Sequence, residues 1–443
     1  KFGGGNDNWR WPRHTGEFSV FSVYANKDNK AANYSPDNVP YQPKYSVPVS
    51  IKGFKDKDYA MTIGYPGSTE RYMSSWGITQ MVESEHKPRI EVRGAKQDIW
   101  RAAMNASDAV RIKYASKYAG SSNYWKNAMG MNEAIAKLGV IKDKEKLEEK
   151  FSLCAGSTKN KAKYGDVLST LREGYTSTMD VAKMQTYLYE TFYNGIEIVR
   201  FANTALFVAR MDVSERESDL KARMTNIYKD YEPELDRKVM PVLLKLYADR
   251  VPAEYLPSIY SKIETEFAGD YDKYAEWFYN NTKLTSLDGI VALTATEDTE
   301  AMLNDPAMEL AKSLEPCLKL LRDGFAPYTT NIEKGGRLFM AGLMEMEPKK
   351  AFYPDANFTQ RLSYGSIGGY KPADAVTYDY YTTSKGVLEK QKPGDPEFGV
   401  QQYILDDIAK GDFGQYAAPD GKMHVAFLSN NDITGGNSGS PVF

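Results

Sequence analysis

The last nine residues of the chain, GGNSGSPVF, place a serine where its hydroxyl could act as a nucleophile. Ser438 lies between small residues, with Gly436 two positions before it, so its oxygen can be exposed while neighbouring backbone N–H groups point at one spot. This arrangement suits acyl transfer, because the serine attacks a carbonyl carbon and the N–H groups of Gly436 and Ser438 stabilise the oxyanion that develops. Ser438 is therefore a candidate nucleophile, and Gly436 part of a candidate oxyanion hole.

The residues around Ser438 indicate which class of hydrolase this loop resembles. The string Gly-x-Ser-Gly-x-Pro is that of chymotrypsin-like serine peptidases, whereas the α/β-hydrolase elbow, Gly-x-Ser-x-Gly, would need glycine at Ser440. The apolar run at 425–428, followed by the polar run at 429–432, predicts a strand that leads into this loop. For the loop taken alone, a glycine- and serine-rich turn without function is the alternative.

A second stretch rich in reactive and polar side chains opens the chain, NDNWRWPRHTGEFS at residues 6–19. Asn8 and Trp9 can together form a cradle for a small polar ligand, because an amide oxygen orients a cation and an indole face covers it. Core packing is the competing interpretation for one of the two tryptophans. The alternating run Val20–Ala25 that follows predicts a strand.

Four ordered motifs resemble the bacterial dipeptidyl-peptidase 7 and 11 family of serine exopeptidases. They are FGGGNDNWRWPRHTGEFS near the start, GYPGST at 64–69, SNYWKN at 122–127 and FLSNNDITGGNSGSPV near the end, so the resemblance covers essentially the whole chain. It implies an α+β fold, in which a chymotrypsin-like double β-barrel is interrupted by a large all-α helical domain. It also implies a catalytic triad in the order His, Asp, Ser along the chain.

The resemblance divides the chain into three parts. Residues 1–70 are expected to end the first part of the peptidase β-barrel domain, 71–355 to form an α-helical lid, and 356–443 to return to the barrel with the nucleophile loop. Turn-rich, alternating sequence at 45–51 and 59–63 predicts strands of the first part. Strands are also expected near residues 400–405.

The periodicity of apolar residues predicts the helices of the middle part. Apolar side chains recur at three- and four-residue spacing from Ile99 to Tyr118 and again from Val181 to Val199, which is typical of buried helix faces. The heavily charged stretch from Val213 to Arg250 predicts a solvated amphipathic helix pair with salt bridges of mixed sign. Asp305–Pro306 predicts the start of another helix, because proline is well tolerated in a first turn.

Carried over position by position, the resemblance places the nucleophile on Ser438 and the triad acid on Glu17, where the family's HTGD string ends in aspartate. Glutamate is one methylene longer, and a displacement of about 1 Å could lower the rate on the order of a hundredfold. Glutamate nevertheless serves as triad acid in some hydrolases. His14 matches the family's PRHTG histidine, which is not the triad base, while His86 and His424 follow the acid and are expected on loop or strand surfaces.

The resemblance assigns Asn8, Trp9 and Asn123 to the free α-amino group of the substrate. Converging acceptors satisfy a buried ammonium group, whereas an internal peptide bond would leave them unpaired, so chain ends are selected. A helix cap is the competing interpretation for Asn123. The implied function is release of dipeptides from the free N-terminus of oligopeptides through an acyl-enzyme. A chymotrypsin-like endopeptidase with a helical regulatory insert and a catalytically inactive peptide-binding homologue are the alternatives.

Size and composition set the remaining expectations. A chain of 443 residues with a net charge of −3 gives no reason to expect nucleic acid or an anionic membrane as a partner. No stretch approaches the roughly 18 consecutive apolar residues of a transmembrane helix. No metal or cofactor is implied, and Cys154 and Cys317 could form one disulfide bond or none. The family is typically dimeric and periplasmic, so a periplasmic homodimer is expected.

Both ends of the sequence lead us to expect a longer chain. Lys1 is preceded by neither an initiator methionine nor a signal region, and Phe443 stops within an expected strand. Only His14 precedes the expected acid, so the triad base is expected upstream and this piece alone is expected to be inert. The residues that select a hydrophobic or an acidic second substrate residue are expected downstream.

Overall fold

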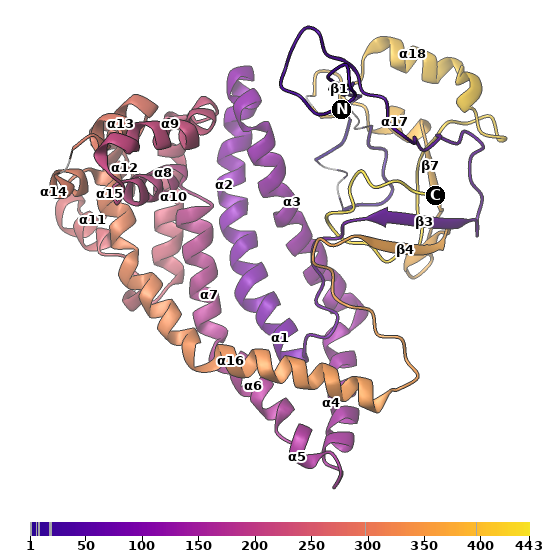
Figure 1. The fold of residues 1–443 in the computed structure, drawn as a ribbon, viewed down its shortest axis with the longest axis horizontal. Coiled ribbons are helices and arrows are strands. Elements are labelled where there is room, and N and C mark those ends of the chain that lie inside the picture. Colours follow the sequence, from indigo (N-terminus) through magenta and orange to yellow (C-terminus); the bar gives the residue numbers. More distant parts are fainter. Residues whose placement is uncertain (1, 6, 8, 17–19, 297, 396) are drawn as a thin grey trace. The chain divides into compact units, whose positions relative to one another are not determined.

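The computed structural model describes residues 2–5, 7, 9–16, 20–296, 298–395 and 397–443. The chain divides into two compact units (Figure 1). The strand-bearing unit consists of Lys1–Glu70 and Pro354–Phe443, and the helical unit consists of Arg71–Tyr353. In the sequence, the helical unit is therefore inserted between the two parts of the strand-bearing unit.

The strand-bearing unit has short strands that pair two by two in antiparallel fashion. The pairs are β1 (Tyr24–Ala25) with β2 (Val39–Pro40), β3 (Tyr59–Gly64) with β4 (Arg361–Ser366), β5 (Tyr370–Ala373) with β6 (Val376–Tyr378), and β7 (Tyr381–Thr383) with β8 (His424–Phe427). Its helices are α17 (Lys385–Lys390), α18 (Gln402–Lys410) and the 3₁₀ turn η4 (Gly414–Tyr416). The sheets among the described residues do not close into a barrel.

The pairing of β3 with β4 joins the two parts of the strand-bearing unit. Six residues of each strand are in register, from Tyr59 opposite Ser366 to Gly64 opposite Arg361. The last residues of the chain lie along β3 as well, because the backbone N–H and C=O groups of Met61 and Phe443 exchange two hydrogen bonds of 2.8 Å. The segment that carries Ser438 is therefore held at both of its ends by neighbouring strands.

Several predicted strands of this unit differ from the observed ones. The strand predicted at Val20–Ala25 is reduced to β1, and residues 45–51 form no strand. The apolar side chains at 20–23 and 45–51 are exposed and have no sheet to cover among the described residues. The strand expected near 400–405 is wrong, since Gln402 begins helix α18 and its side chain donates a hydrogen bond to Asp406 one turn later. The strands predicted at 59–63 and 425–428 are confirmed as β3 and, shifted by one residue, β8.

The helical unit is built from helices alone among the residues that are described. In order they are α1 (Ser75–Gln80), the π-helix η1 (Met81–His86), α2 (Lys87–Ala106), α3 (Asp108–Leu138), α4 (Val140–Ala155), α5 (Lys161–Tyr164), α6 (Val167–Ser177), α7 (Met179–Leu188), the π-helix η2 (Tyr189–Tyr193), α8 (Glu197–Val208), α9 (Val213–Lys229), α10 (Pro233–Arg250), the 3₁₀ turn η3 (Ala253–Tyr255), α11 (Ile259–Phe267), α12 (Tyr271–Asn281), α13 (Leu287–Thr294), α14 (Thr299–Leu303), α15 (Pro306–Ser313) and α16 (Glu315–Met346). As Figure 1 shows, α2 packs beside α3, α7 and α10, and α16 crosses α6 and α7.

Local signals explain where the main helices begin and end. Ser107 separates α2 from α3, and its hydroxyl caps α3 by accepting a hydrogen bond from the N–H of Val110. α3 ends at Gly139, whose φ of 65° is a left-handed conformation that glycine adopts readily. Asp305 caps α15, with Pro306 in its first turn, as predicted. No helix among the described residues is both long and apolar enough to cross a membrane.

The core of the helical unit consists of two clusters of buried side chains. The larger is centred on residues such as Phe192 and Leu243, and the smaller on Phe151 and Phe339, where α4, α6 and α16 meet. Burying one such side chain contributes roughly 1.5–3 kcal/mol. Gly342 allows α16 to approach α4, since a Cβ there would lie only 2.4 Å from the ring of Phe151.

The charged stretch from Val213 to Arg250 forms α9 and α10, which differ in character. The exposed side of α9 carries the i,i+4 ion pairs Glu217–Lys221 and Asp219–Arg223, as predicted. α10 likewise carries ion pairs of mixed sign on its exposed side, Lys245–Asp249 and Arg237–Glu234, as predicted. It differs from α9 in how much it adds to the core, because its interior side chains from Leu235 to Tyr247 belong to the larger cluster. Both cysteines are free thiols.

Candidate active site

The serine loop begins where β8 ends. After β8, Leu428 donates its N–H to the carbonyl of Tyr380 at 2.8 Å, and Ser429 bridges to Ile367 next to β4. Asn430 then exchanges two bonds with Ser366, donating its backbone N–H at 3.1 Å and accepting at its side-chain oxygen at 2.7 Å. The chain is therefore guided along the β3–β4 pair before it turns towards Ser438.

The side chain of Asn431 binds the start of the serine loop to both β3 and β4. Its side-chain NH₂ group lies 3.3 Å from each of three acceptors, which are the carbonyls of Ala60 and Ser363 and the hydroxyl of Thr62. Its own oxygen is buried and has no hydrogen-bond partner among the described residues. An asparagine here fixes the start of the loop through bonds that a purely apolar residue could not make.

The serine loop, residues 434–441, is a pair of tight turns around Ser438. Gly436 has φ 105° and Gly439 has φ 81°, values that disfavour residues with a side chain. Ser440 donates its N–H to the carbonyl of Asn437 at 2.9 Å, which closes the second turn. Ser438 lies exposed at the tip. Among the described residues, neither its N–H group nor that of Gly436 has a protein acceptor.

The GYPG segment at 64–67 forms the support of the serine loop. The N–H of Gly67 donates to the carbonyl of Gly435 at 2.6 Å. A Cβ on Gly64 would lie 2.2 Å from Oδ1 of Asn437 and 2.3 Å from Oγ of Ser440, and a Cβ on Gly436 would lie 2.4 Å from the carbonyl oxygen of Tyr65. The two glycine-rich segments thus contact each other more closely than any residues with side chains could.

The N-terminal segment folds around a buried carboxylate, that of Asp7. The Nζ of Lys390 lies 2.9 Å from both oxygens of Asp7, and the N–H of His14 donates to Oδ2 at 3.0 Å. Trp9 has the left-handed φ of 63° and a side chain that is 47% exposed, so it is not the core tryptophan of the competing interpretation. Asn8 and Glu17 lie outside the described residues.

None of the three histidines hydrogen-bonds to Ser438 among the described contacts. His14 is buried, and burial, followed by the charge of Lys390, lowers its pKa against the opposing charge of Asp7. His86 is also buried, which corrects the expectation of a surface residue, and its Nδ1 lies 2.6 Å from Oδ1 of Asn132 inside the helical unit. His424 begins β8 as a half-buried strand residue. No triad base is identified among them.

Asn123 lies in the interior of α3, in the helical unit, so it is not a helix cap. Its turn of α3 is held by Arg93 of α2, which donates to the carbonyl of Ser121 at 3.3 Å and lies over the ring of Tyr124. Arg93 is itself paired with the buried carboxylate of Glu190 at 2.7 and 3.0 Å. Arg93 and Glu190 are thus supporting residues that the sequence motif did not indicate.

The comparison with protein families identifies the chain. The model of the family described as peptidase S46 matches residues 1–443. The chain belongs to the peptidase S46 family. Among curated S46 relatives, it is 50% identical over 448 residues to dipeptidyl-peptidase 7 of Porphyromonas gingivalis, covering 100% of this chain and 62% of the relative. It is 36% identical over 458 residues to the Asp/Glu-specific dipeptidyl-peptidase of Capnocytophaga gingivalis, covering 100% of this chain and 63% of the relative.

A solved S46 structure shares this fold. It is the crystal structure of Porphyromonas endodontalis DPP11 in complex with the dipeptide Arg-Glu, with a TM-score of 0.88, 33% identity, and coverage of 100% of this chain and 64% of that chain. The S46 chain described here therefore spans just under two thirds of the length of the relatives it matches. The combination of one large helical unit with small sheets is common to both structures.

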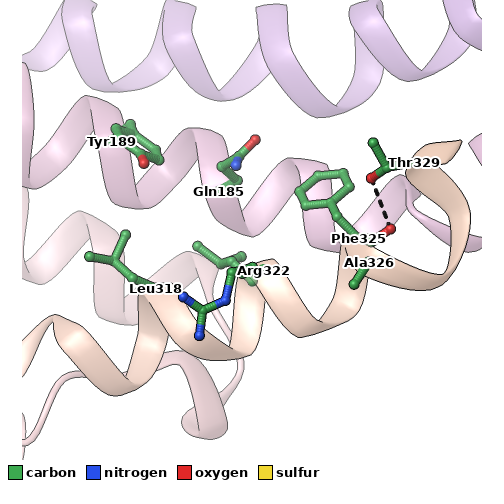
Figure 2. A pocket seen from close by; sticks show the side chains of 8 residues that line it. Gln185, Tyr189, Leu318, Arg322, Phe325, Ala326 and Thr329 are labelled. Atoms are coloured by element: carbon green, nitrogen blue, oxygen red, sulfur yellow. Dashed lines mark hydrogen bonds between the residues drawn. The ribbon is translucent and has the colours of Figure 1, made fainter. Parts of the chain in front are cut away.

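The helical unit of the S46 chain also contains a groove of about 470 Å³ between α7, η2 and α16. Figure 2 shows its lining, with Gln185 and Tyr189 on one side and Leu318, Arg322 and Phe325 on the other. None of the predicted site residues lines this groove. Among the described residues, no cluster of three or more His, Cys, Asp or Glu side chains could hold a metal ion.

The structure thus brings together some of the predicted site residues. Ser438 and Gly436 both lie in the serine loop, and Trp9 belongs to the same unit. The segment that carries Trp9 contacts β7, because Thr382 donates to the carbonyl of Arg13, and β7 pairs with β8, which precedes the serine loop. Asn123 belongs to the helical unit. Sequence reasoning missed Asn431, Lys390 and the supporting role of Gly64, although the GYPGST motif was a visible signal for the last.

Proposed function

We propose that this chain supplies the serine nucleophile and the amine-binding residues of a dipeptidyl-peptidase that releases dipeptides from free N-termini. The observation that carries the proposal is the serine loop, in which Ser438 is exposed between two glycines of positive φ and next to undonated N–H groups. An exposed hydroxyl with adjacent donors is the minimum that acyl transfer needs. Membership of the peptidase S46 family and the names of the relatives point the same way.

The proposed reaction passes through an acyl-enzyme on Ser438. The serine oxygen bonds to the carbonyl carbon of the second peptide bond while its proton passes to a histidine base, and the N–H groups of Gly436 and Ser438 stabilise the oxyanion. The C–N bond then breaks as the histidine protonates the leaving amine, and water cleaves the ester to free the dipeptide. Glu17 is proposed to orient the histidine, which we place in the part of the relatives that this chain does not cover.

The proposed substrate is an oligopeptide with a free N-terminus. Asn8, Trp9 and Asn123 are proposed to bind its α-ammonium group, so that an internal peptide bond would leave their polar groups unpaired. Residues 1–70 and 356–443 are proposed to form parts of a chymotrypsin-like double β-barrel, with 71–355 as its lid. The resemblance of the motifs further supports a periplasmic homodimer, which cell fractionation and sedimentation of the full-length protein would test.

The test is dipeptide release by the full-length protein. We would use fluorogenic peptides with free and with acetylated N-termini, and with hydrophobic or acidic residues in the second position. Turnover of the free amines alone is expected, and Ser438→Ala should abolish it. Ser429→Ala is the matched control, because Ser429 is an exposed serine between β8 and the serine loop. Covalent labelling of Ser438 by a peptidyl phosphonate would show that this oxygen is the nucleophile.

The other outcomes separate the alternatives. Cleavage of acetylated peptides would indicate an endopeptidase and contradict the proposed amine binding. Binding of dipeptides without turnover would indicate an inactive homologue. In that case Glu17→Asp should restore turnover if the longer acid is the cause, since one methylene displaces the carboxylate by about 1 Å.

A further inference from the structure

Asp7 is the centre of a buried polar cluster in the N-terminal segment. Its side chain is only 7% exposed, and both of its oxygens accept hydrogen bonds. Lys390, the last residue of α17, donates to both oxygens at 2.9 Å, and the N–H of His14 donates to Oδ2 at 3.0 Å. A buried carboxylate with this many donors is well satisfied and geometrically fixed.

Lys390 also forms a hydrogen bond with a second residue of the N-terminal segment, Pro12. Its Nζ donates to the carbonyl of Pro12 at 3.0 Å, so that one ammonium group ties Asp7 to Pro12. Two further contacts to the N-terminal segment come from β7 and from α17. The hydroxyl of Thr382 in β7 donates to the carbonyl of Arg13 at 2.6 Å, and Gly386 of α17 lies against the ring of His14, where a Cβ would come within 1.8 Å of Nε2.

The stretch between these fixed points carries Trp9 in an uncommon backbone conformation. Its φ of 63° lies in the left-handed region, which bulky residues rarely adopt unless the surrounding structure imposes it. Arg10 donates its N–H to the carbonyl of Asp7 at 3.2 Å and so closes a turn around Trp9. With its ends fixed, this turn presents the indole with 47% of the side chain exposed.

We propose that Asp7 and Lys390 are positioning residues that hold Trp9 in its left-handed turn and thereby set amine recognition. This inference rests on the proposed function, in which Trp9 contacts the substrate's α-ammonium group. A buried ion pair contributes little net stability compared with apolar residues of similar volume, so specification of one local geometry is a reason to have it here. The role differs from that of a triad acid, because the carboxylate of Asp7 is already occupied by Lys390 and His14.

The decisive variant is the double substitution Asp7→Leu with Lys390→Met in the full-length protein. It removes the buried charges together, which keeps the fold more safely than either single change would, because no charge is left unpaired. We expect KM for a free-amine peptide to rise about tenfold or more, with a much smaller change in kcat, as for loss of a binding contact. The preference for free over acetylated peptides should fall in parallel.

Two further variants separate positioning from general stability. Lys390→Arg keeps the charge and the donors and should retain most of the wild-type KM. Lys385→Met, in the same helix, removes a lysine whose side chain is 81% exposed and should change neither constant. A double variant that unfolds at the wild-type temperature and keeps the wild-type KM and amine preference would overturn the inference.

A readout without turnover distinguishes failure of this inference from failure of the proposed function. The emission of Trp9 can be isolated as the difference between a protein and the same protein carrying Trp9→Phe. We expect this difference spectrum to shift in the double variant and to remain unchanged in Lys385→Met. If the wild type releases no dipeptide, the proposed function fails, while an unaltered Trp9 spectrum in the double variant would overturn the positioning role by itself.

Discussion

Gly64 lies directly against Ser440 of the serine loop, and this contact limits which residue types either position can hold. A Cβ on Gly64 would come within 2.3 Å of the Ser440 hydroxyl and 2.2 Å of Asn437. Since neither atom is at the far end of a long side chain, the loop itself would have to move. The position of Ser438 therefore depends on the absence of a side chain at residue 64.

We expect Gly64→Ala to impair catalysis more than folding. A displacement of the loop by about 1 Å should lower kcat on the order of a hundredfold, whereas β3 and β4 keep their pairing. The matched control is Gly368→Ala, where the nearest atom to a new Cβ would be 3.7 Å away. Steady-state kinetics and thermal unfolding of the full-length variants would check this. Equal kcat in both would contradict the proposed support of the loop.

For single residues, the sequence allowed the serine loop to be predicted but not the residues that hold the loop in place. Gly436, Ser438 and Gly439 are close in the sequence, and their types alone specify a tight turn with an exposed hydroxyl. The contacts of Gly64, Asn431 and Lys390 join residues far apart in the chain, and no local pattern encodes such pairs. For the same reason, the pairing of Asp7 with Lys390 could not be predicted from the sequence.

Among the elements, α8 and α10 meet through a buried carboxylate. Asp236 of α10 accepts hydrogen bonds from the N–H groups of Glu197 and Ile198 at 2.9 Å each, at the N-terminus of α8, and from the hydroxyl of Tyr231 at 3.0 Å. Burial, reinforced by the charge of Glu197, raises the pKa of Asp236 to about 7, although the backbone hydrogen bonds favour the charged form. This group is therefore neutral in the folded protein at mildly acidic pH.

The raised pKa of Asp236 predicts a pH dependence of stability. A carboxyl that binds its proton more tightly in the folded state stabilises that state fully below its unfolded pKa of 3.8, and this contribution is lost as pH rises to about 7. The loss has an upper bound of about 4 kcal/mol at 1.36 kcal/mol per pKa unit. Denaturant unfolding of wild type and Asp236→Asn at pH 5 and pH 8 would measure the part of this loss that falls between those two pH values.

The comparison between the two proteins isolates this one group. Other carboxylates contribute equally to both, so the wild type should lose more free energy of unfolding than Asp236→Asn between the two pH values. Asp98→Asn serves as a control, because its carboxylate is 78% exposed and lies 4.0 Å from Arg101. Parallel pH curves for wild type and Asp236→Asn would show that the pKa of Asp236 is not raised.

Elements were predicted best where periodicity and burial agree. The spacing from Val181 to Val199 correctly identified buried residues. The observed chain nevertheless divides into α7, the π-helix η2 and α8. The break comes at Gly195, which packs against the carbonyl of Thr191, and at Ile196, whose backbone is extended. Residues 400–405 were mistaken for a strand because short apolar runs fit either period. The extended segments at 20–23 and 45–51 have strand-like composition, but a strand also requires a neighbour.

For the whole molecule, the decisive feature is that both core clusters lie within the helical unit. The two ends of this unit also lie close together, since the hydroxyl of Tyr72, its second residue, donates to the carbonyl of Tyr353, its last, at 2.5 Å. The strand-bearing unit instead exposes many apolar side chains, including Val20, Phe21 and Val49. We therefore expect Arg71–Tyr353 to be the more stable of the two units.

We expect residues 71–353 to fold when produced alone. Circular dichroism should show a helical spectrum and one cooperative thermal transition. Leu243→Ala, at a fully buried position of the larger cluster, should destabilise the unit by roughly 2–5 kcal/mol, whereas Leu320→Ala, at a position 37% exposed, should change its stability far less. A gradual, non-cooperative loss of helicity in the unsubstituted unit would show that its core depends on the rest of the chain.

The adjacency of Tyr72 and Tyr353 also bears on the order of events during synthesis. β3 is made long before β4, its pairing partner, and the whole helical unit is translated between them. Closing a long flexible segment is entropically costly, but a folded insert with neighbouring ends shortens the path between the two strands. The helical unit is therefore expected to fold first during translation and to bring β4 to β3. The serine loop, supported by that strand pair, would then take up its conformation only after β4 has paired with β3, so a nascent chain would present Ser438 only once the helical unit has folded.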